Sequence, residues 1–178
     1  MTAPSAIVLG GGHSRRYGRD KLTAPWSDST LLARVIGAVP ADRHELLLVV
    51  REGQIEDRFD GVDRLVADDP SRPEGPLRGL VAGLRASRSP WNWALGCDLP
   101  RLRTPMLELL RSRIDDHVDA IVFRHDGHAE PLVAMYARTC LPGFTAALDD
   151  GDVALRHALR RVRSVWIEDA SWRHLDPD

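Results

Sequence analysis

The chain of 178 residues has a formal net charge of −2, from 24 lysine and arginine residues against 26 aspartate and glutamate residues. This balance argues against a general nucleic-acid binder, because neutralising a phosphate backbone usually requires a strongly basic domain. A chain of this length can bury a sizeable hydrophobic core and shows no internal repeat or linker, so we expect a single domain over residues 1–178.

Seven short apolar runs, which we expect to form strands, alternate with amphipathic segments along the chain. The predicted strands are 7–9, 45–50, 64–66, 93–96, 120–123, 133–136 and 165–167. Several of them are continuous runs of Leu, Val and Ile, as is typical of strands that are buried on both faces of a sheet.

The segments between these runs carry apolar residues at helical spacing. They predict helices at 30–39, 79–86 and 104–114, and the arginines between 156 and 163 are expected to line the solvated face of a further helix. The stretch 68–76 contains three prolines and Gly75 and is expected to be a loop. The alternation predicts an α/β fold with a mostly parallel sheet and helices on both faces.

The first predicted strand leads directly into Leu-Gly-Gly-Gly-His-Ser-Arg-Arg-Tyr-Gly-Arg-Asp-Lys, residues 9–21. Its last residue, Lys21, is the only lysine of the chain. A compact ammonium is a common partner of phosphate, and glycines bring backbone N–H groups close to a ligand. A strand, a glycine loop and cations in this order favour a nucleotide site; a tight turn with a solvated basic rim is the alternative.

Two familiar phosphate loops are excluded by spacing. A Walker loop ends in Gly-Lys followed by Ser or Thr, whereas Asp20 precedes Lys21 here and Leu22 follows it. The dinucleotide fingerprint places its third glycine where this chain has Arg15, whose side chain would block close helix–strand packing.

An aspartate follows the strand predicted at 93–96, in the sequence Gly96-Cys97-Asp98-Leu99-Pro100. Ligands of parallel α/β sheets bind outside the carboxyl ends of the strands, where Asp98 is expected. Mg²⁺ is commonly held by one or two protein carboxylates together with phosphate oxygens, so Asp98 is a candidate metal ligand. The alternative is that Asp98 caps the following turn or helix.

The cysteines and the length of the apolar runs indicate in which cellular compartment the protein is expected. Cys97 and Cys140 form no Cys-x-x-Cys pair, which indicates neither a disulfide framework nor a structural zinc site. No apolar stretch approaches the roughly 20 residues that span a bilayer, and the N-terminus lacks the pattern of a signal peptide. We therefore expect a cytoplasmic protein with neither a membrane nor a nucleic acid as partner.

Four motifs stand in one order along the chain: residues 9–21, Gly-Pro-Leu-x-Gly-Leu at 75–80, Cys-Asp-x-Pro at 97–100 and Glu-Pro-Leu-Val-Ala-Met-Tyr at 130–136. In this order and spacing the chain resembles the molybdenum cofactor nucleotidyltransferases, most of all their guanylyltransferase branch. The resemblance covers nearly the whole chain. It implies a Rossmann-like, glycosyltransferase-A-like fold, and the Mg²⁺-dependent transfer of GMP from GTP to molybdenum–molybdopterin with release of pyrophosphate.

The resemblance also implies roles for individual residues. It places Leu9, Gly10, Gly11, Gly12, Gly75 and Pro76 at the nucleotide, Arg16 and Lys21 at the triphosphate, Asp68 near the base or ribose, Asp98 and Asp176 at Mg²⁺, and Glu130 and Pro131 on the pterin side. Lys21, Arg16 and Asp98 would be catalytic, since they would stabilise the charge that develops on the departing pyrophosphate. Transient contacts with proteins that make or accept the cofactor are also implied.

Two departures from the family leave the details open. The guanylyltransferases often carry an asparagine near the base after the second strand, where this chain continues from Val50 to Arg51. The C-terminal segment is shorter and has His174 in place of another asparagine. Alternatives are therefore CMP transfer to the same cofactor, nucleotide transfer to a sugar phosphate, and a nucleotide-binding accessory protein with little catalysis.

Overall fold

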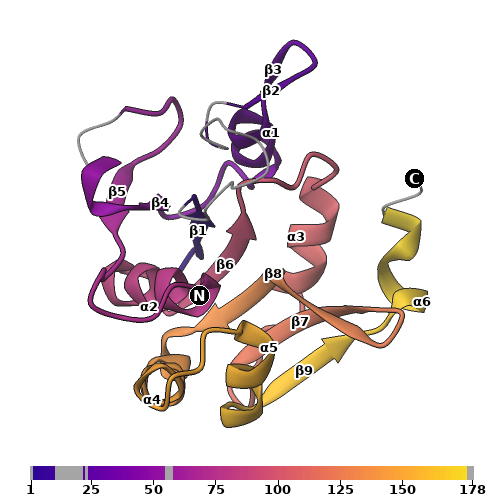
Figure 1. Cartoon of the computed structure of the whole chain (residues 1–178). Helices are drawn as coiled ribbons and strands as arrows, with labels where there is room; N and C mark the ends of the chain where they lie inside the picture. Colours follow the sequence, from indigo (N-terminus) through magenta and orange to yellow (C-terminus); the bar gives the residue numbers. More distant parts are fainter. Residues whose placement is uncertain (1, 11–21, 23, 55–57, 176–178) are drawn as a thin grey trace.

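A seven-stranded sheet forms the centre of the computed structural model, which describes residues 2–10, 22, 24–54 and 58–175 (Figure 1). The strand order is β5-β4-β1-β6-β8-β7-β9. The bounds are β1 Ser5–Leu9, β4 Leu46–Val50, β5 Arg64–Ala67, β6 Trp91–Gly96, β7 Ala120–His125, β8 His128–Ala137 and β9 Ser164–Ile167. All seven predicted strands are present.

The pairing makes the sheet mostly parallel, as predicted. Strands β5, β4, β1 and β6 are parallel neighbours, and β9 is parallel to β7. Only β8 runs antiparallel to both of its neighbours. Leu9 is level with Val49 on one side and with Gly96 on the other, so the carboxyl ends of β1, β4 and β6 meet at one edge.

Helices cover both faces of the sheet (Figure 1). One core layer contains residues of α1 (Leu31–Ala38) and α3 (Thr104–Arg111), and the other contains residues of α2 (Pro76–Ala86), α4 (Leu141–Asp149) and α5 (Leu155–Ala158). Neighbouring residues of β1 alternate between the layers: Ala6 and Val8 belong to the first, and Ile7 to the second. This burial on both faces explains why the strand sequences are continuously apolar.

The remaining elements are short. They are the hairpin β2 (Pro25–Trp26) and β3 (Ser29–Thr30), α6 (Asp169–Trp172), and single 3₁₀ turns at Glu52–Gln54, Arg138–Cys140, Leu159–Arg161 and Arg173–Leu175. Thr30 caps α1 by accepting a hydrogen bond from the Ala33 N–H at 3.1 Å. Among the described residues, no helix has the length and apolar character needed to cross a membrane.

Two helix predictions need correction, and one helix was not predicted. The helix predicted at 79–86 starts earlier, at Pro76, because proline is well suited to the first position of a helix. The long helix expected around 156–163 is instead α5 followed by a 3₁₀ turn, although Leu155 and Leu159 are buried as expected. Helix α4 was not predicted; Phe144, Ala147 and Leu148 form its buried face.

Candidate functional site

Strand β1 ends at the carboxyl edge of the sheet, where Gly10 follows Leu9. The Gly10 N–H donates to the Val49 carbonyl at 2.8 Å, and the Leu9 carbonyl accepts from the Cys97 N–H at 3.3 Å. A Cβ atom on Gly10 would lie 2.7 Å from Cδ2 of Leu22 and 3.1 Å from the Val49 carbonyl oxygen, so a larger residue here would have to displace the Leu22 side chain. The predicted site residues Gly11, Gly12, Arg16, Lys21 and Asp176 lie outside the described residues.

A cleft of about 280 Å³ opens at this edge, between the strand ends and the start of α2. Its lining includes Leu9, Asp68, Gly75, Pro76 and Asp98. The structure therefore brings together, at one cleft, predicted site residues that come from four separate segments of the sequence.

The two carboxylates of this cleft stand on different strands. Asp68 directly follows β5, and Asp98 follows β6. In the sheet order these strands are three steps apart, which corresponds to about 14 Å at the usual strand spacing. The cleft thus has one carboxylate beside the end of β5 and the other beside the end of β6.

Asp98 is exposed to solvent at the end of β6. A Cβ atom on Gly96 would lie 3.0 Å from Oδ1 of Asp98, so the glycine leaves room for the carboxylate to fold back over the strand end. An exposed carboxylate at a strand end is the type of oxygen ligand that Mg²⁺ prefers, since the ion retains water and phosphate oxygens as its other ligands.

The first N–H groups of α2 are already engaged. Pro76 has no N–H, Leu77 donates to the Val153 carbonyl at 3.4 Å, and Arg78 donates to the Gly75 carbonyl at 3.2 Å. Val153 lies so close that a Cβ atom on Gly75 would approach its carbonyl oxygen to 2.7 Å. The start of α2 therefore forms a wall of the cleft.

Asp68 is 7% exposed and is ion-paired with Arg78, whose Nη2 lies 2.6 Å from Oδ2. The Nε atom of Arg78 donates to the same oxygen at 2.8 Å. Sequence reasoning missed Arg78, because it lies at the variable position of the Gly-Pro-Leu-x-Gly motif and only the fold brings it to Asp68.

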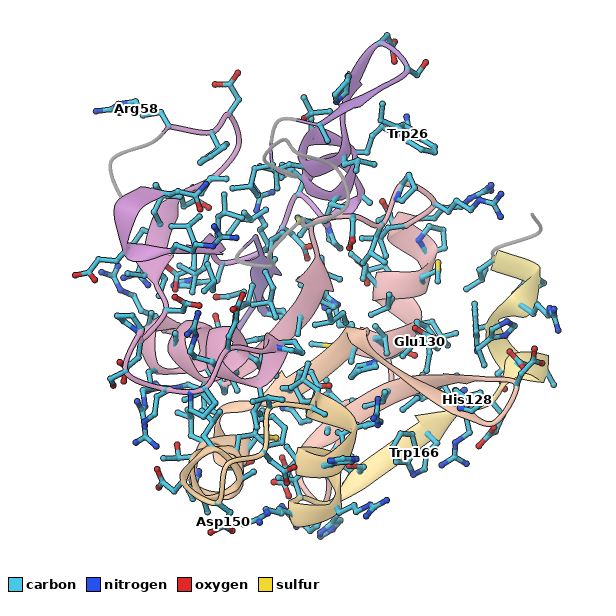
Figure 2. The ribbon with its side chains drawn as sticks, in the orientation of Figure 1. Trp26, Arg58, His128, Glu130, Asp150 and Trp166 are labelled. Carbon is cyan, nitrogen blue, oxygen red and sulfur yellow. The ribbon has the colours of Figure 1, made fainter. Side chains whose placement is uncertain are left out.

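A second cleft, of about 430 Å³, is also lined by Asp98, which thus lines both clefts. Its apolar lining includes Phe123, Val133 and Trp172, and the exposed Glu130 of β8, labelled in Figure 2, also lines it. Two arginines, Arg101 and Arg173, also line it. Arg101 and Arg173 are far apart in the sequence, so the sequence alone did not predict that they line the same cleft.

The C-terminal segment forms part of this second cleft because it is fastened to β7. Nδ1 of His125 lies 2.9 Å from Oδ1 of Asp169, and the Asp126 N–H donates to Oδ2 of Asp169 at 2.9 Å. Nε1 of Trp172 donates to the Arg124 carbonyl at 3.2 Å. The segment up to Leu175 is therefore docked rather than a free tail.

The same cluster has the residue types of a metal site, since ligand atoms of His125, Asp126 and Asp169 lie within 4.8 Å of one another. Both oxygens of Asp169 and Nδ1 of His125 are already engaged within the cluster. We therefore interpret the cluster as a structural link, here called the fastening, in which hydrogen bonds from His125 and Asp126 to Asp169 hold α6 against the turn of the β7–β8 hairpin.

We predict that this fastening weakens as the pH rises. The hydrogen bond that His125 donates to Asp169 raises the pKa of His125 above its ordinary value of 6.5. The charges of Asp126 and Asp169 add to the effect, while burial of the ring and the charge of Arg173 oppose it. A raised pKa means that the His125 contribution is complete below pH 6.5 and is lost as the pH rises through the folded value. NMR titration of the His125 ring, with hydrogen exchange over residues 169–175, would measure both effects.

The control for this titration is the Glu168→Gln variant. Glu168 also lies at the start of α6, but its carboxylate pairs with Arg124 at 3.0 Å. We expect Asp169→Asn to lower the pKa of His125 markedly and Glu168→Gln to change it little. An unchanged pKa in Asp169→Asn would contradict the prediction.

Comparison with known proteins gives a consistent result. Residues 6–166 match the family model described as MobA-like NTP transferase domain. A molybdenum cofactor guanylyltransferase of Pseudomonas putida is 33% identical over 159 residues, covering 88% of this chain and 82% of that protein. Another, from Desulfosudis oleivorans, is 28% identical over 179 residues, covering 100% of this chain and 87% of that protein.

A solved structure supports the same fold. It is the molybdopterin-guanine dinucleotide biosynthesis protein A of Archaeoglobus fulgidus, which matches with a TM-score of 0.81 at 23% identity. The match covers 97% of this chain and 87% of that chain. The α/β fold with a mostly parallel sheet is therefore the fold of that solved structure.

Proposed function

The chain belongs to the MobA-like NTP transferase family, and from that premise we propose that this nucleotidyltransferase transfers GMP from GTP to the molybdenum–molybdopterin cofactor, releasing pyrophosphate. The observation that carries the proposal is the pair of clefts that meet at Asp98. A group transfer between two bound molecules needs two adjacent binding sites, with the reacting atoms held together where the sites meet. Here a charged residue, Asp98, lies at that position. We propose residues 1–178 as one nucleotidyltransferase domain.

The smaller cleft is the proposed nucleotide site. Asp68 would face the nucleoside, and the strand end at Leu9 and Gly10 leads into the loop to which we assign the triphosphate. Within that loop, Gly11, Gly12, Arg16 and Lys21 are assigned from the sequence motif alone. The spacing of about 14 Å between β5 and β6 supports a nucleotide extended from Asp68 to Asp98.

Asp98 is the proposed Mg²⁺ ligand, with Asp176 proposed from the sequence as a second one. The exposed carboxylate, for which Gly96 leaves space, fits a hard cation that also takes phosphate oxygens. When bound, Mg²⁺ would supply charge neutralisation at the α-phosphate and at the leaving pyrophosphate.

The larger cleft is the proposed acceptor site. Its apolar side chains suit the flat ring system of a pterin, and its arginines suit a terminal phosphate. A phosphate oxygen of the acceptor would attack the α-phosphorus of GTP. The bond between the α-phosphorus and the oxygen that bridges it to the β-phosphorus would break, and pyrophosphate would leave with that oxygen. The chain would contribute by aligning the two molecules and by offsetting the repulsion between their anionic groups.

Binding of GTP, CTP, ATP and UTP, with and without Mg²⁺, tests the nucleotide half, and pyrophosphate release upon adding the molybdenum cofactor tests the transfer. We expect Mg²⁺-dependent preference for GTP, and pyrophosphate only when the acceptor is present. A preference for CTP would replace guanylyl by cytidylyl transfer. Binding without pyrophosphate release would overturn the enzymatic role in favour of an accessory one.

A further inference from the structure

Arg78 is held in one orientation at the wall of the nucleotide cleft. Its side chain is 11% exposed. Two of its nitrogens contact Oδ2 of Asp68, at 2.6 and 2.8 Å, and Nη1 donates to the Arg72 carbonyl at 3.0 Å. All three guanidinium nitrogens are thus used, which fixes the plane of the group.

The contacts also fix Asp68. Its backbone N–H donates to the Val50 carbonyl at 3.0 Å, and both contacts of its carboxylate with Arg78 are made to Oδ2. Oδ1 takes part in neither of these two contacts. A carboxylate held through one oxygen presents the other in a defined direction, where it can accept hydrogen bonds.

The charge of the pair suits a site for a polyanion. An isolated aspartate would repel the phosphates of a nucleotide, but the guanidinium beside Asp68 offsets its negative charge. What remains is an oriented hydrogen-bond acceptor at the end of the cleft far from Asp98. This end is the one where the sequence offers no amide, since Arg51 follows Val50.

We propose that Arg78 is a positioning residue for the nucleoside. It holds Asp68 so that Oδ1 accepts from N–H or O–H donors of the nucleoside, and it thereby supplies the selectivity for which the sequence carries no asparagine after β4. This inference rests on the proposed nucleotide site. The donors are either the N1–H and 2-amino group of guanine or the ribose hydroxyls, which share this hydrogen-bonding chemistry.

The test compares GTP binding and steady-state kinetics in the full-length wild type, Arg78→Ala, Arg78→Lys, Asp68→Asn and the double variant Arg78→Ala/Asp68→Asn. We expect Arg78→Ala to raise the Kd and KM for GTP about tenfold while kcat stays near normal, because one oriented hydrogen bond to a charged group is lost. Because Arg78 acts through Asp68, the double variant should bind GTP no more weakly than whichever single variant has the lower affinity for GTP.

Arg78→Lys guards against a simple loss of folding. Lysine keeps the charge, but its single ammonium cannot reproduce the fork that contacts both Asp68 and Arg72. We expect this variant to remain folded, as judged by thermal unfolding, and to bind GTP several-fold more weakly. Wild-type affinity for GTP in this variant would overturn the positioning role.

The matched control is Arg85→Ala. Arg85 is an exposed arginine of the same helix, and its Nη2 contacts Oγ1 of Thr145 at 3.2 Å. We expect no change in GTP binding. Additive effects of Arg78→Ala and Asp68→Asn, or equal affinity of wild type and Arg78→Ala, would overturn the inference, whereas absence of nucleotide binding in the wild type would overturn the proposed function itself.

Analogues identify the donors. If Oδ1 contacts guanine, inosine triphosphate, which lacks the 2-amino group, should bind the wild type more weakly than GTP, and Arg78→Ala should reduce this difference. If Oδ1 contacts the ribose, 2′-deoxy-GTP or 3′-deoxy-GTP should instead bind the wild type more weakly than GTP, and Arg78→Ala should reduce that difference. Either result supports the positioning role. Equal effects of Arg78→Ala on GTP and on all three analogues would overturn it.

Discussion

Asp98→Ala is expected to lower turnover at least about 100-fold, because removing one electrostatic contact with the transition state commonly costs about 3–4 kcal/mol. Asp98 lines both clefts and is therefore placed where the nucleotide and the acceptor would meet. Its side chain is exposed, so the midpoint of thermal unfolding should stay near the wild-type value. Steady-state pyrophosphate release and calorimetry on the same samples would measure both quantities.

The control is Asp116→Ala, which removes the same charge from an exposed loop position that lines neither cleft. It should turn over like the wild type. Lys21→Ala is expected to match Asp98→Ala in size, since both residues are assigned to the charge on the phosphates. Near-normal turnover in Asp98→Ala would refute its assignment as the metal ligand.

The largest effect on stability is expected for Asp119→Ala, which should lower the free energy of unfolding by about 2 kcal/mol through the loss of hydrogen bonds to a buried carboxylate. Asp119 is 8% exposed, and its carboxylate accepts from Nε and Nη2 of Arg163 at 2.8 and 2.9 Å and from Thr139 at 2.6 Å. Because Arg163 precedes β9 and Asp119 precedes β7, these bonds hold the outer strand pair together. Denaturant unfolding would measure the loss.

The control is Asp150→Ala. Asp150 also pairs with an arginine, Arg161, at 2.6 Å, but its side chain is 64% exposed. Exposed pairs contribute little, so the expected change is below about 1 kcal/mol. An equal loss in the two variants would show that the burial of Asp119 does not decide the effect.

The Asp119 contribution should depend on pH in a defined direction. The hydrogen bond from Arg163 holds the pKa of Asp119 well below its ordinary value of 3.8. The resulting stability is complete above pH 3.8 and is lost as the pH falls through the folded pKa. The difference in unfolding free energy between wild type and Asp119→Asn should therefore be constant near neutral pH and shrink in acid.

The strands could be predicted because their signal is local. Continuous Leu, Val and Ile runs identify buried strands regardless of their neighbours. The reversal of β8 was not predicted, yet a local signal existed: Asp126-Gly127, with φ of 47° and 78°, forms the tight turn of the β7–β8 hairpin. The α4 and α5 boundaries depend on packing against the sheet, which short apolar patterns do not specify.

The sequence by itself determined the order of the strands along the chain, the α/β class and the candidate Asp98, because strand ends are encoded by adjacent residues. Leu9 and Asp68 became candidates through the family resemblance. Only the tertiary structure decided the partners. It placed Arg78 beside Asp68, fastened Asp169 to His125 and made Asp98 common to two clefts. The physical reason is that side-chain contacts depend on strand order and helix docking, which are set by burial of the whole chain rather than by residue spacing.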